Sequence, residues 1–165
     1  MKRSWVVVLL ALFASLAVVG TVLATHTPNP TNVITLSQRG TLTREVKYNG
    51  DGIKVQTKNP VDVVTAEVTF AKATSTTNGA SSGWHNHPGP VFVVIRTGTL
   101  AVWDENCVKT TYSQGQSFFE AGPDESILVK NESATIDATA YATFIVPVGA
   151  GPLTTRTSHL CGITE

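Results

Sequence analysis

Two histidines separated by a single residue, His85 and His87, are the side chains of this sequence best suited to chemistry. They lie in the stretch GWHNHPG, between glycines and a proline. Side chains two residues apart on an extended segment point to the same side. Imidazole nitrogen is a good ligand for Zn, Fe, Cu and Ni. The pair therefore indicates either a metal site or two polar side chains that are hydrogen-bonded inside a β-protein.

The segments that must position these histidines read as β-strands. Stretches rich in Val, Ile, Thr, Phe and Tyr alternate with Gly, Pro, Asn and Asp signals at short intervals. No stretch after residue 24 keeps a helical apolar period. The pattern predicts an all-β sandwich or barrel. The expected strands are NVITLSQ, IKVQTK, DVVTAEVTFAK, VFVVIRTGTLAVWD, TTYSQ, QSFFEA, SILVKNES and IDATAYATFIVPV.

Strand alternation predicts which way these side chains point. In VFVVIR, residues 91–96, the charged Arg96 should face water. That sends the even-numbered positions outward and the odd-numbered positions inward. Because His85 and His87 share the odd parity, we expect both imidazoles inside the β-structure.

The N-terminus has the layout of a secretory signal peptide. Lys2 and Arg3 precede a short apolar run, and the small residues Val22 and Ala24 fit a cleavage site after residue 24. The alternative is an uncleaved membrane anchor, since the 20 residues from 5 to 24 could span a bilayer. We therefore divide the chain into a signal peptide or anchor at 1–24, a lead-in and first strand at 25–50, and the main domain at 51–165.

Charge and cysteine content narrow the class of protein. Without residues 1–24, all 12 acidic and 10 of the 12 basic residues remain, a net charge of −2 with no basic run, so nucleic acid is not an expected partner. The two cysteines, Cys107 and Cys161, predict a disulfide in an exported protein. Closing that loop stabilises the fold by about 4 kcal/mol in the loop-entropy model. A thiolate site is the alternative, but neither cysteine lies in a CxxC pair or near the histidine motif.

The spacing around the histidines resembles that of a cupin. The first cupin motif is a glycine, five residues, His-x-His, three or four residues, Glu, six residues and Gly. His85 and His87 fill its histidine positions, Val91 stands in the glutamate position and Gly98 closes it. The stretch GQSFFEAGPDESILVKN, 115–131, resembles the second motif without its histidine. The resemblance covers about residues 60–150, is strongest to small exported bacterial cupins, and implies a cupin-type jelly-roll β-barrel with both histidines facing its interior.

The same resemblance implies a metal site with missing ligands. Metal-binding cupins use three histidines and a glutamate, and this chain supplies two of the four. Depending on how the second motif is anchored, Ser126, Glu125 or Ile127 occupies the third histidine position. If Lys130 faces solvent, alternation turns Glu125 inward.

A site of His85, His87 and Glu125 would suit a divalent transition metal such as Zn, Fe, Cu, Ni or Mn. The alternative is that Glu125 is solvated in the polar turn GPDES. Glu120 and Asp124 are further candidates that nothing in the sequence singles out.

These observations lead to two functional hypotheses. The first is an exported protein, extracellular or in the cell envelope, that binds a small-molecule ligand or a metal weakly in the barrel interior without turnover. The second is a metal-dependent enzyme, an oxygenase or isomerase, that uses His85, His87 and Glu125. The resemblance also implies a possible homodimer, and a membrane is a partner only if residues 1–24 are not cleaved.

Overall fold

The computed structural model describes residues 32–163, with backbone only at 35–37, so the predicted signal peptide at 1–24 lies outside it. Among these residues there are twelve strands, and no helix that could cross a membrane. The strands are β1 (Val33–Leu42), β2 (Lys47–Gly50), β3 (Ile53–Gln56), β4 (Val61–Phe70), β5 (His85–Asn86), β6 (Val91–Thr97), β7 (Thr99–Trp103), β8 (Lys109–Ser113), β9 (Ser117–Glu120), β10 (Leu128–Lys130), β11 (Ala138–Pro147) and β12 (Thr155–Arg156). The all-β prediction is confirmed.

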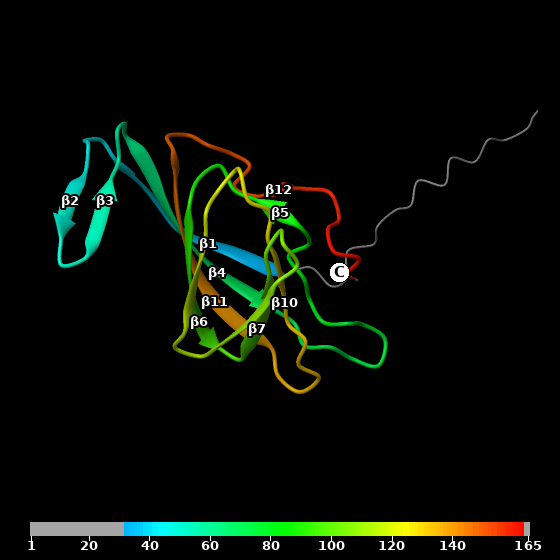
Figure 1. The fold of residues 1–165 in the computed structure, drawn as a ribbon. Helices are drawn as coiled ribbons and strands as arrows, with labels where there is room; N and C mark the ends of the chain where they lie inside the picture. The colour runs from blue at the N-terminus through cyan, green and yellow to red at the C-terminus, as the bar shows by residue number, and fades with distance from the viewer. Residues whose placement is uncertain (1–31, 164–165) are drawn as a thin grey trace, which may run out of the picture.

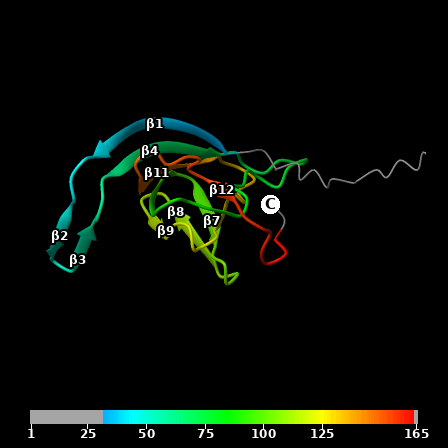
Figure 2. The same ribbon diagram turned by 90° about the horizontal axis from the view of Figure 1, so that it is seen from above.

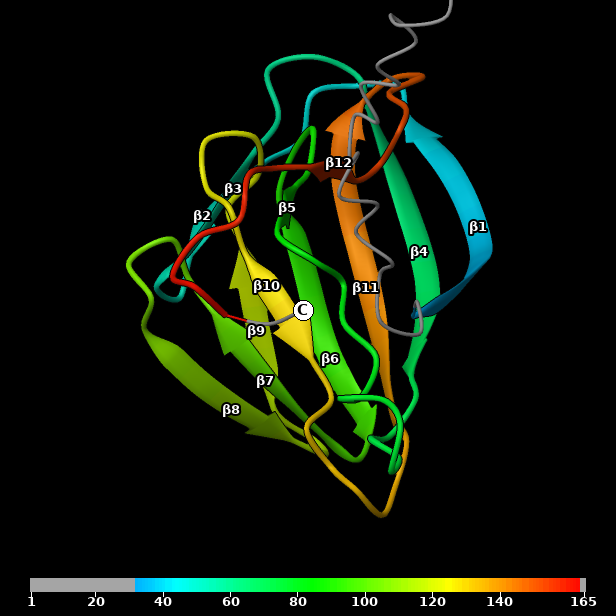
Figure 3. The same ribbon diagram turned by 90° about the vertical axis from the view of Figure 1, so that its right-hand side faces the viewer.

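Two antiparallel sheets enclose the core (Figure 3). The larger sheet has the strand order β1-β4-β11-β6-β9, and the smaller has the order β10-β7-β8. Consecutive strands along the chain often lie in different sheets, so the chain crosses between sheets as in a jelly roll. The two remaining strand pairs, β12-β5 and β2-β3, lie outside these sheets.

Alternate residues of the long strands form this core. In β6 the buried and exposed positions alternate as predicted, with odd-numbered residues inside. Strands β4 and β11 alternate in the same way, and their inward side chains meet those of β7, β9 and β10 in a single apolar cluster. Ile95 and Leu100 are at most 1% exposed, and burying a side chain of this size contributes about 1.5–3 kcal/mol.

Strands β2 and β3 form a hairpin that projects from the two sheets (Figures 1 and 2). Asp51 and Gly52 join the two strands and both have positive φ, as a tight type I′ turn requires. Most of its residues are exposed. The expected boundary between residues 50 and 51 falls at this turn, while β1 pairs along its length with β4 of the larger sheet.

Asp62 ties β1 to the rest of the larger sheet. Its carboxylate accepts hydrogen bonds from Thr41 Oγ1 at 2.7 Å, Arg39 Nη1 at 2.9 Å and Gly149 N at 2.9 Å. The Thr41 hydrogen bond, followed by those from Gly149 and Arg39, lowers the pKa of Asp62 because each favours the charged form. The edge strand β1 is thus anchored at its C-terminal half.

Residues 150–163, here called the C-terminal strap, return across the smaller sheet. The strap includes β12, which pairs with β5. Its residues Leu160 and Ile163 pack on a second apolar cluster, made of Trp84, Ala101, Trp103 and Leu128. The predicted disulfide between Cys107 and Cys161 is present, with an S–S distance of 2.01 Å. The strap is therefore fastened both by packing and by a covalent bond.

Candidate metal centre

His85 and His87 are positioned by β5 and by the segment that leads into β6. The backbone of His85 exchanges two hydrogen bonds with Ile127, at 2.9 and 3.0 Å. Two residues after His87, Gly89 lies so close to β11 that an added Cβ would be 2.2 Å from Ile145 O. Only glycine fits there, and this fixes the path of the chain from His87 into β6. Both histidines are 4% exposed, as the alternation predicted.

The third side chain of the site is Glu120, at the end of β9. Phe118 and Glu120 are the buried positions of β9 and face inward. The antiparallel register of β6 and β9 places Glu120 directly opposite Val91, the residue in the glutamate position of the first motif. A carboxylate therefore reaches the two histidines from the strand beside the one that the motif predicts.

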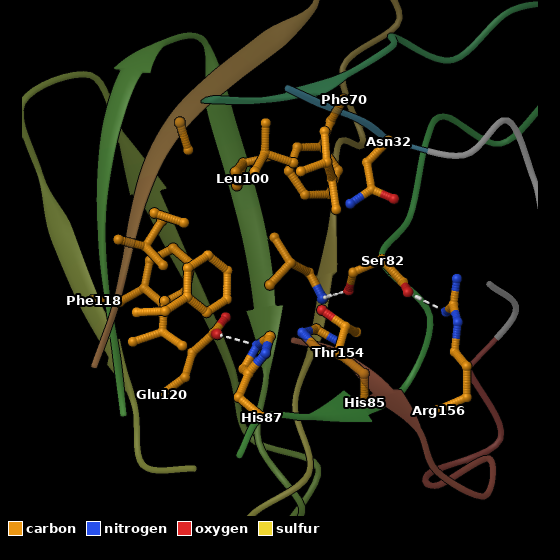
Figure 4. Close-up of a pocket in the computed structure, with 18 residues that line it drawn as sticks. Asn32, Phe70, Ser82, His85, His87, Leu100, Phe118, Glu120, Thr154 and Arg156 are labelled. Carbon is orange, nitrogen blue, oxygen red and sulfur yellow. Dashed lines mark hydrogen bonds and ion pairs between the residues drawn. The ribbon is translucent and has the colours of Figure 1, made fainter. Parts of the chain in front are cut away.

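His85, His87 and Glu120 converge in the interior (Figure 4). One ligand atom from each lies within 4.8 Å of the other two. His87 Nε2 is 2.7 Å from Glu120 Oε2, and the two imidazole rings meet edge to face with centroids 4.7 Å apart. All three residues are buried. Two imidazoles and one carboxylate are the donors that a divalent transition metal takes with positions left open.

Backbone carbonyls orient both imidazoles. His85 Nδ1 lies 2.8 Å from Gly83 O, and His87 Nδ1 lies 2.6 Å from Leu153 O, which belongs to the C-terminal strap. A carbonyl oxygen can only accept, so each Nδ1 carries the proton and donates it. In its neutral form, each ring then presents an unprotonated Nε2 atom to the site. Metal-binding histidines show this same arrangement, because the second hydrogen bond fixes the tautomer.

The donor set fits a cation. When both rings are neutral and protonated at Nδ1, the groups that meet here are the lone pairs of two Nε2 atoms and the oxygens of Glu120. His87 Nε2 is buried and makes no hydrogen bond of acceptable geometry, although the carboxylate oxygen is only 2.7 Å away. A buried acceptor facing another acceptor is costly unless a proton or a metal ion lies between them.

Burial lowers the pKa of His85, because desolvation disfavours the imidazolium. The Glu120 carboxylate opposes this shift, while His87 adds to it. The result favours the neutral imidazole, which is the form that binds a metal.

The structure does not bring Glu125 to the histidines. Glu125 is exposed and borders a separate cavity of about 180 Å³, together with Asp104 and Glu105. The inward orientation expected for Glu125 is wrong, since Glu125 is exposed as in the alternative of a solvated turn, and the carboxylate beside the two histidines belongs to Glu120. The inward orientation was inferred from Lys130 facing solvent, whereas Lys130 is 8% exposed, so the alternation argument began from a wrong assumption. Neither Ser126 nor Ile127 lines the cavity that His85, His87 and Glu120 border.

One signal in the sequence could have singled out Glu120. In SFFE the period-two pattern that buries Phe118 also buries Glu120. A glutamate on the apolar side of a short strand is unusual, since carboxylates are rarely fully buried without a partner. Placing Glu120 beside the histidines also requires knowing that β9 pairs with β6. The sequence pattern does not reveal that pairing.

The fold and the site agree with the resemblance found in the sequence. Two facing antiparallel sheets form a jelly roll, and the His-x-His segment is turned into the space between them. No family model and no curated protein matches the chain.

Several solved structures are similar to the chain. A cupin domain from Bordetella pertussis Tohama I is 20% identical over 71% of this chain and 95% of its own, with a TM-score of 0.45. A conserved protein with a double-stranded β-helix domain from Klebsiella pneumoniae is 15% identical over 74% and 83%, with a TM-score of 0.47. A cupin-like protein from Thermotoga maritima is 13% identical over 61% and 68%, with a TM-score of 0.48.

Proposed function

We propose that this protein is an exported cupin-type protein that binds one divalent transition metal through His85, His87 and Glu120. The observation that carries the proposal is the convergence of three buried acceptor groups within 4.8 Å of one another. The hydrogen bonds that hold both imidazoles by Nδ1 support it further. Export is supported by the Cys107–Cys161 disulfide, because such bonds persist in oxidising compartments.

The metal would bind a small ligand that occupies the adjoining cavity. The three side chains border a cavity of about 280 Å³ whose other walls are largely apolar. Three protein ligands leave coordination positions for a ligand molecule or water. A bound metal would act there as a Lewis acid or orient the ligand. The residues of the chain hold the metal, fix the imidazole tautomers and keep the surroundings dry.

A second candidate function is catalysis by the same centre, as in a metal-dependent oxygenase or isomerase. The observation that favours it is the carboxylate itself, because a set of two histidines and one carboxylate holds iron(II) with open positions in oxygenases. We rank it second because no further His, Cys, Asp or Glu among the described residues joins the group of three ligands.

Metal analysis of the protein tests the proposal. The full chain is produced in an export host without a histidine tag, and its metal content is measured by plasma mass spectrometry. Zn, Ni, Cu and Fe(II) are then titrated by calorimetry. We expect about one equivalent of metal for the wild type and none for the His85→Ala/His87→Ala variant.

Glu120→Gln and Glu125→Gln form a matched pair, since both remove one carboxylate charge and keep the side-chain size. We expect Glu120→Gln to weaken binding at least about 10-fold, because it removes a charged ligand atom. Glu125→Gln should bind as the wild type does. No metal in the wild type after these titrations, or equal loss in the two variants, would contradict the proposed site.

A further inference from the structure

The cavity beside the metal centre has an apolar body. Its walls come from both sheets and include Val68, Phe70, Val93, Leu100, Phe118 and Phe144. Its volume of about 280 Å³ lies just below the range of about 300–1,000 Å³ that is usual for drug-sized ligands. The occupant is therefore small, and most of its surface is hydrocarbon.

Arg156 brings a positive charge to the border of this cavity. It belongs to β12 of the C-terminal strap and stands opposite His85 in the β5-β12 ladder, so its backbone is next to the metal centre. One guanidinium nitrogen, Nη1, donates to Ser82 O, as Figure 4 shows. Asn32 and Thr154 add polar groups to the cavity wall.

No carboxylate neutralises Arg156 within residues 32–163. Two of the three other arginines in this part of the chain form ion pairs, Arg39 with Asp62 and Arg96 with Glu67. Glu120, the carboxylate that lines the same cavity, lies 2.7 Å from His87 Nε2. Arg156 is exposed, and its bond to Ser82 O, a neutral carbonyl, leaves other guanidinium N–H groups available to a ligand at the border of the cavity. Guanidinium groups bind carboxylates through two parallel N–H donors.

We propose that the cavity binds a small carboxylic acid with an apolar body, whose carboxylate pairs with Arg156. The inference rests on the proposed function, since the ligand shares its cavity with the metal centre. The carboxylate lies on the side of the cavity where Arg156 and His85 are adjacent, and the hydrocarbon part lies against Phe118 and Phe144. A phosphate would suit this place less, because Arg156 is the one Lys or Arg side chain among the described residues that line the cavity.

Matched acids and amides test this proposal. The probes are 3-phenylpropanoate with 3-phenylpropanamide, and hexanoate with hexanamide, which have the same size and differ in charge. Inorganic phosphate is a third probe. Their dissociation constants are measured by calorimetry at pH 7.5, with the protein both zinc-loaded and treated with chelator. We expect at least one acid to bind the wild type about 10-fold or more tightly than its amide, because the ion pair is made with a charged group.

Variants of Arg156 identify the group responsible. In Arg156→Gln the preference for acid over amide should fall to near one, and in Arg156→Lys, which keeps the charge without the planar fork, it should be intermediate. Arg96→Gln is the matched control, since Arg96 lies on the outer face and 51% of its side chain is exposed. Circular dichroism checks that each variant is folded. If Arg156→Gln fails to fold, the preference for acid over amide is compared between the wild type and Arg156→Lys, and this comparison still tests the role of Arg156.

Any of four results would overturn the inference. They are equal binding of acid and amide, a preference that persists in Arg156→Gln, tighter binding of phosphate, and no binding of either acid at millimolar concentration. The metal titrations separate it from the proposed function. A protein that binds metal without preferring acids overturns only the ligand class. A protein that prefers acids through Arg156 but binds no metal supports the ligand class and overturns the metal centre.

Discussion

Glu120 faces Val91 across the pair of strands β9 and β6. Side chains directly opposite each other in an antiparallel pair have Cβ atoms about 4.5–5.5 Å apart. A carboxylate that is missing on one strand can therefore be supplied from the facing position of its neighbour, with little change in where its oxygens lie. A site that looks incomplete along the chain can thus be complete in space, because the sheet register joins residues 29 positions apart in the sequence.

The titration of His85 predicts how stability depends on pH. Burial lowers the pKa of His85 in the folded state, whereas the unfolded chain should titrate near about 6.5. Below that pH the unfolded state binds more protons, so the metal-free protein should lose stability as the pH falls from about 6.5 towards the folded-state pKa. We expect the free energy of unfolding to fall by up to about 1.4 kcal/mol per pH unit in this range.

Urea unfolding of the chelator-treated protein at pH 8, 7, 6 and 5 measures this dependence. His85→Gln is the comparison, because it removes the titrating ring and keeps a polar side chain. Below about pH 6.5 the wild type should lose free energy of unfolding relative to His85→Gln, and this loss should grow as the pH falls. Two parallel curves would mean that His85 does not control the acid response.

At single positions, the sequence indicated the histidines but not their carboxylate. His85 and His87 could be assigned to the interior because strand parity is local, and the structure buries both. The choice of Glu125 depended on whether Lys130 faces water, which packing decides and the sequence pattern does not reveal. Lys130 is buried, so that reasoning turned Glu125 inward, whereas Glu125 is exposed.

At the level of elements, the long strands were predictable and the short ones were not. Strands β4, β6 and β11 carry apolar side chains at every second position, and this pattern is visible without any partner. Strands β5 and β12 have two residues each and exist because they pair with each other. Short pairs of this kind are fixed by tertiary contacts rather than by local preference.

The C-terminal strap links the disulfide to the metal centre. Leu153 O accepts the hydrogen bond from His87 Nδ1, and Thr157 N donates to Trp84 O at 3.0 Å. Cys161 fastens the same segment to Cys107, 54 residues earlier in the chain. The covalent bond thus fastens the segment whose carbonyl orients His87, one of the proposed metal ligands.

We expect Cys107→Ser/Cys161→Ser to lower the free energy of unfolding by about 4 kcal/mol, the loop-entropy value for a loop of this length. The metal dissociation constant should rise about 10-fold, since groups that orient a ligand contribute that much to affinity. Urea unfolding and zinc titration by calorimetry measure the two effects, with dithiol reduction of the wild type as a second route.

Val64→Ala is a control for general destabilisation, because Val64 is 1% exposed in the core of β4 and lies outside the strap. It should unfold more easily yet keep its metal affinity. Unchanged zinc affinity in the disulfide variant would show that the strap stabilises the fold without positioning His87.

On the scale of the whole molecule, the outer face of the larger sheet is unusually apolar. Phe92, Val94, Phe119 and Tyr141 are 45–53% exposed and lie on the adjacent strands β6, β9 and β11. The rings of Phe92 and Phe119 are 5.1 Å apart. At the margin of this face, Arg96 lies over the ring of Tyr141 and pairs with Glu67. An apolar centre with a charged rim is the anatomy of a protein interface.

We expect this outer face to pair with the same face of a second copy, because two-fold dimers are the commonest oligomers and bring identical patches together. Replacing Phe92 and Phe119 by Thr keeps β-propensity while removing aromatic surface, and should weaken dimerisation by at least about 10-fold without unfolding the chain. Val108→Thr is the matched control, since Val108 is 58% exposed in the loop between β7 and β8. Sedimentation velocity across a concentration series measures the state of each protein. The concentration series rises in roughly 100-fold steps to about millimolar. If the wild type stays monomeric throughout, its self-association is weaker than the micromolar dissociation constants of specific pairs. That result would contradict pairing through this aromatic face.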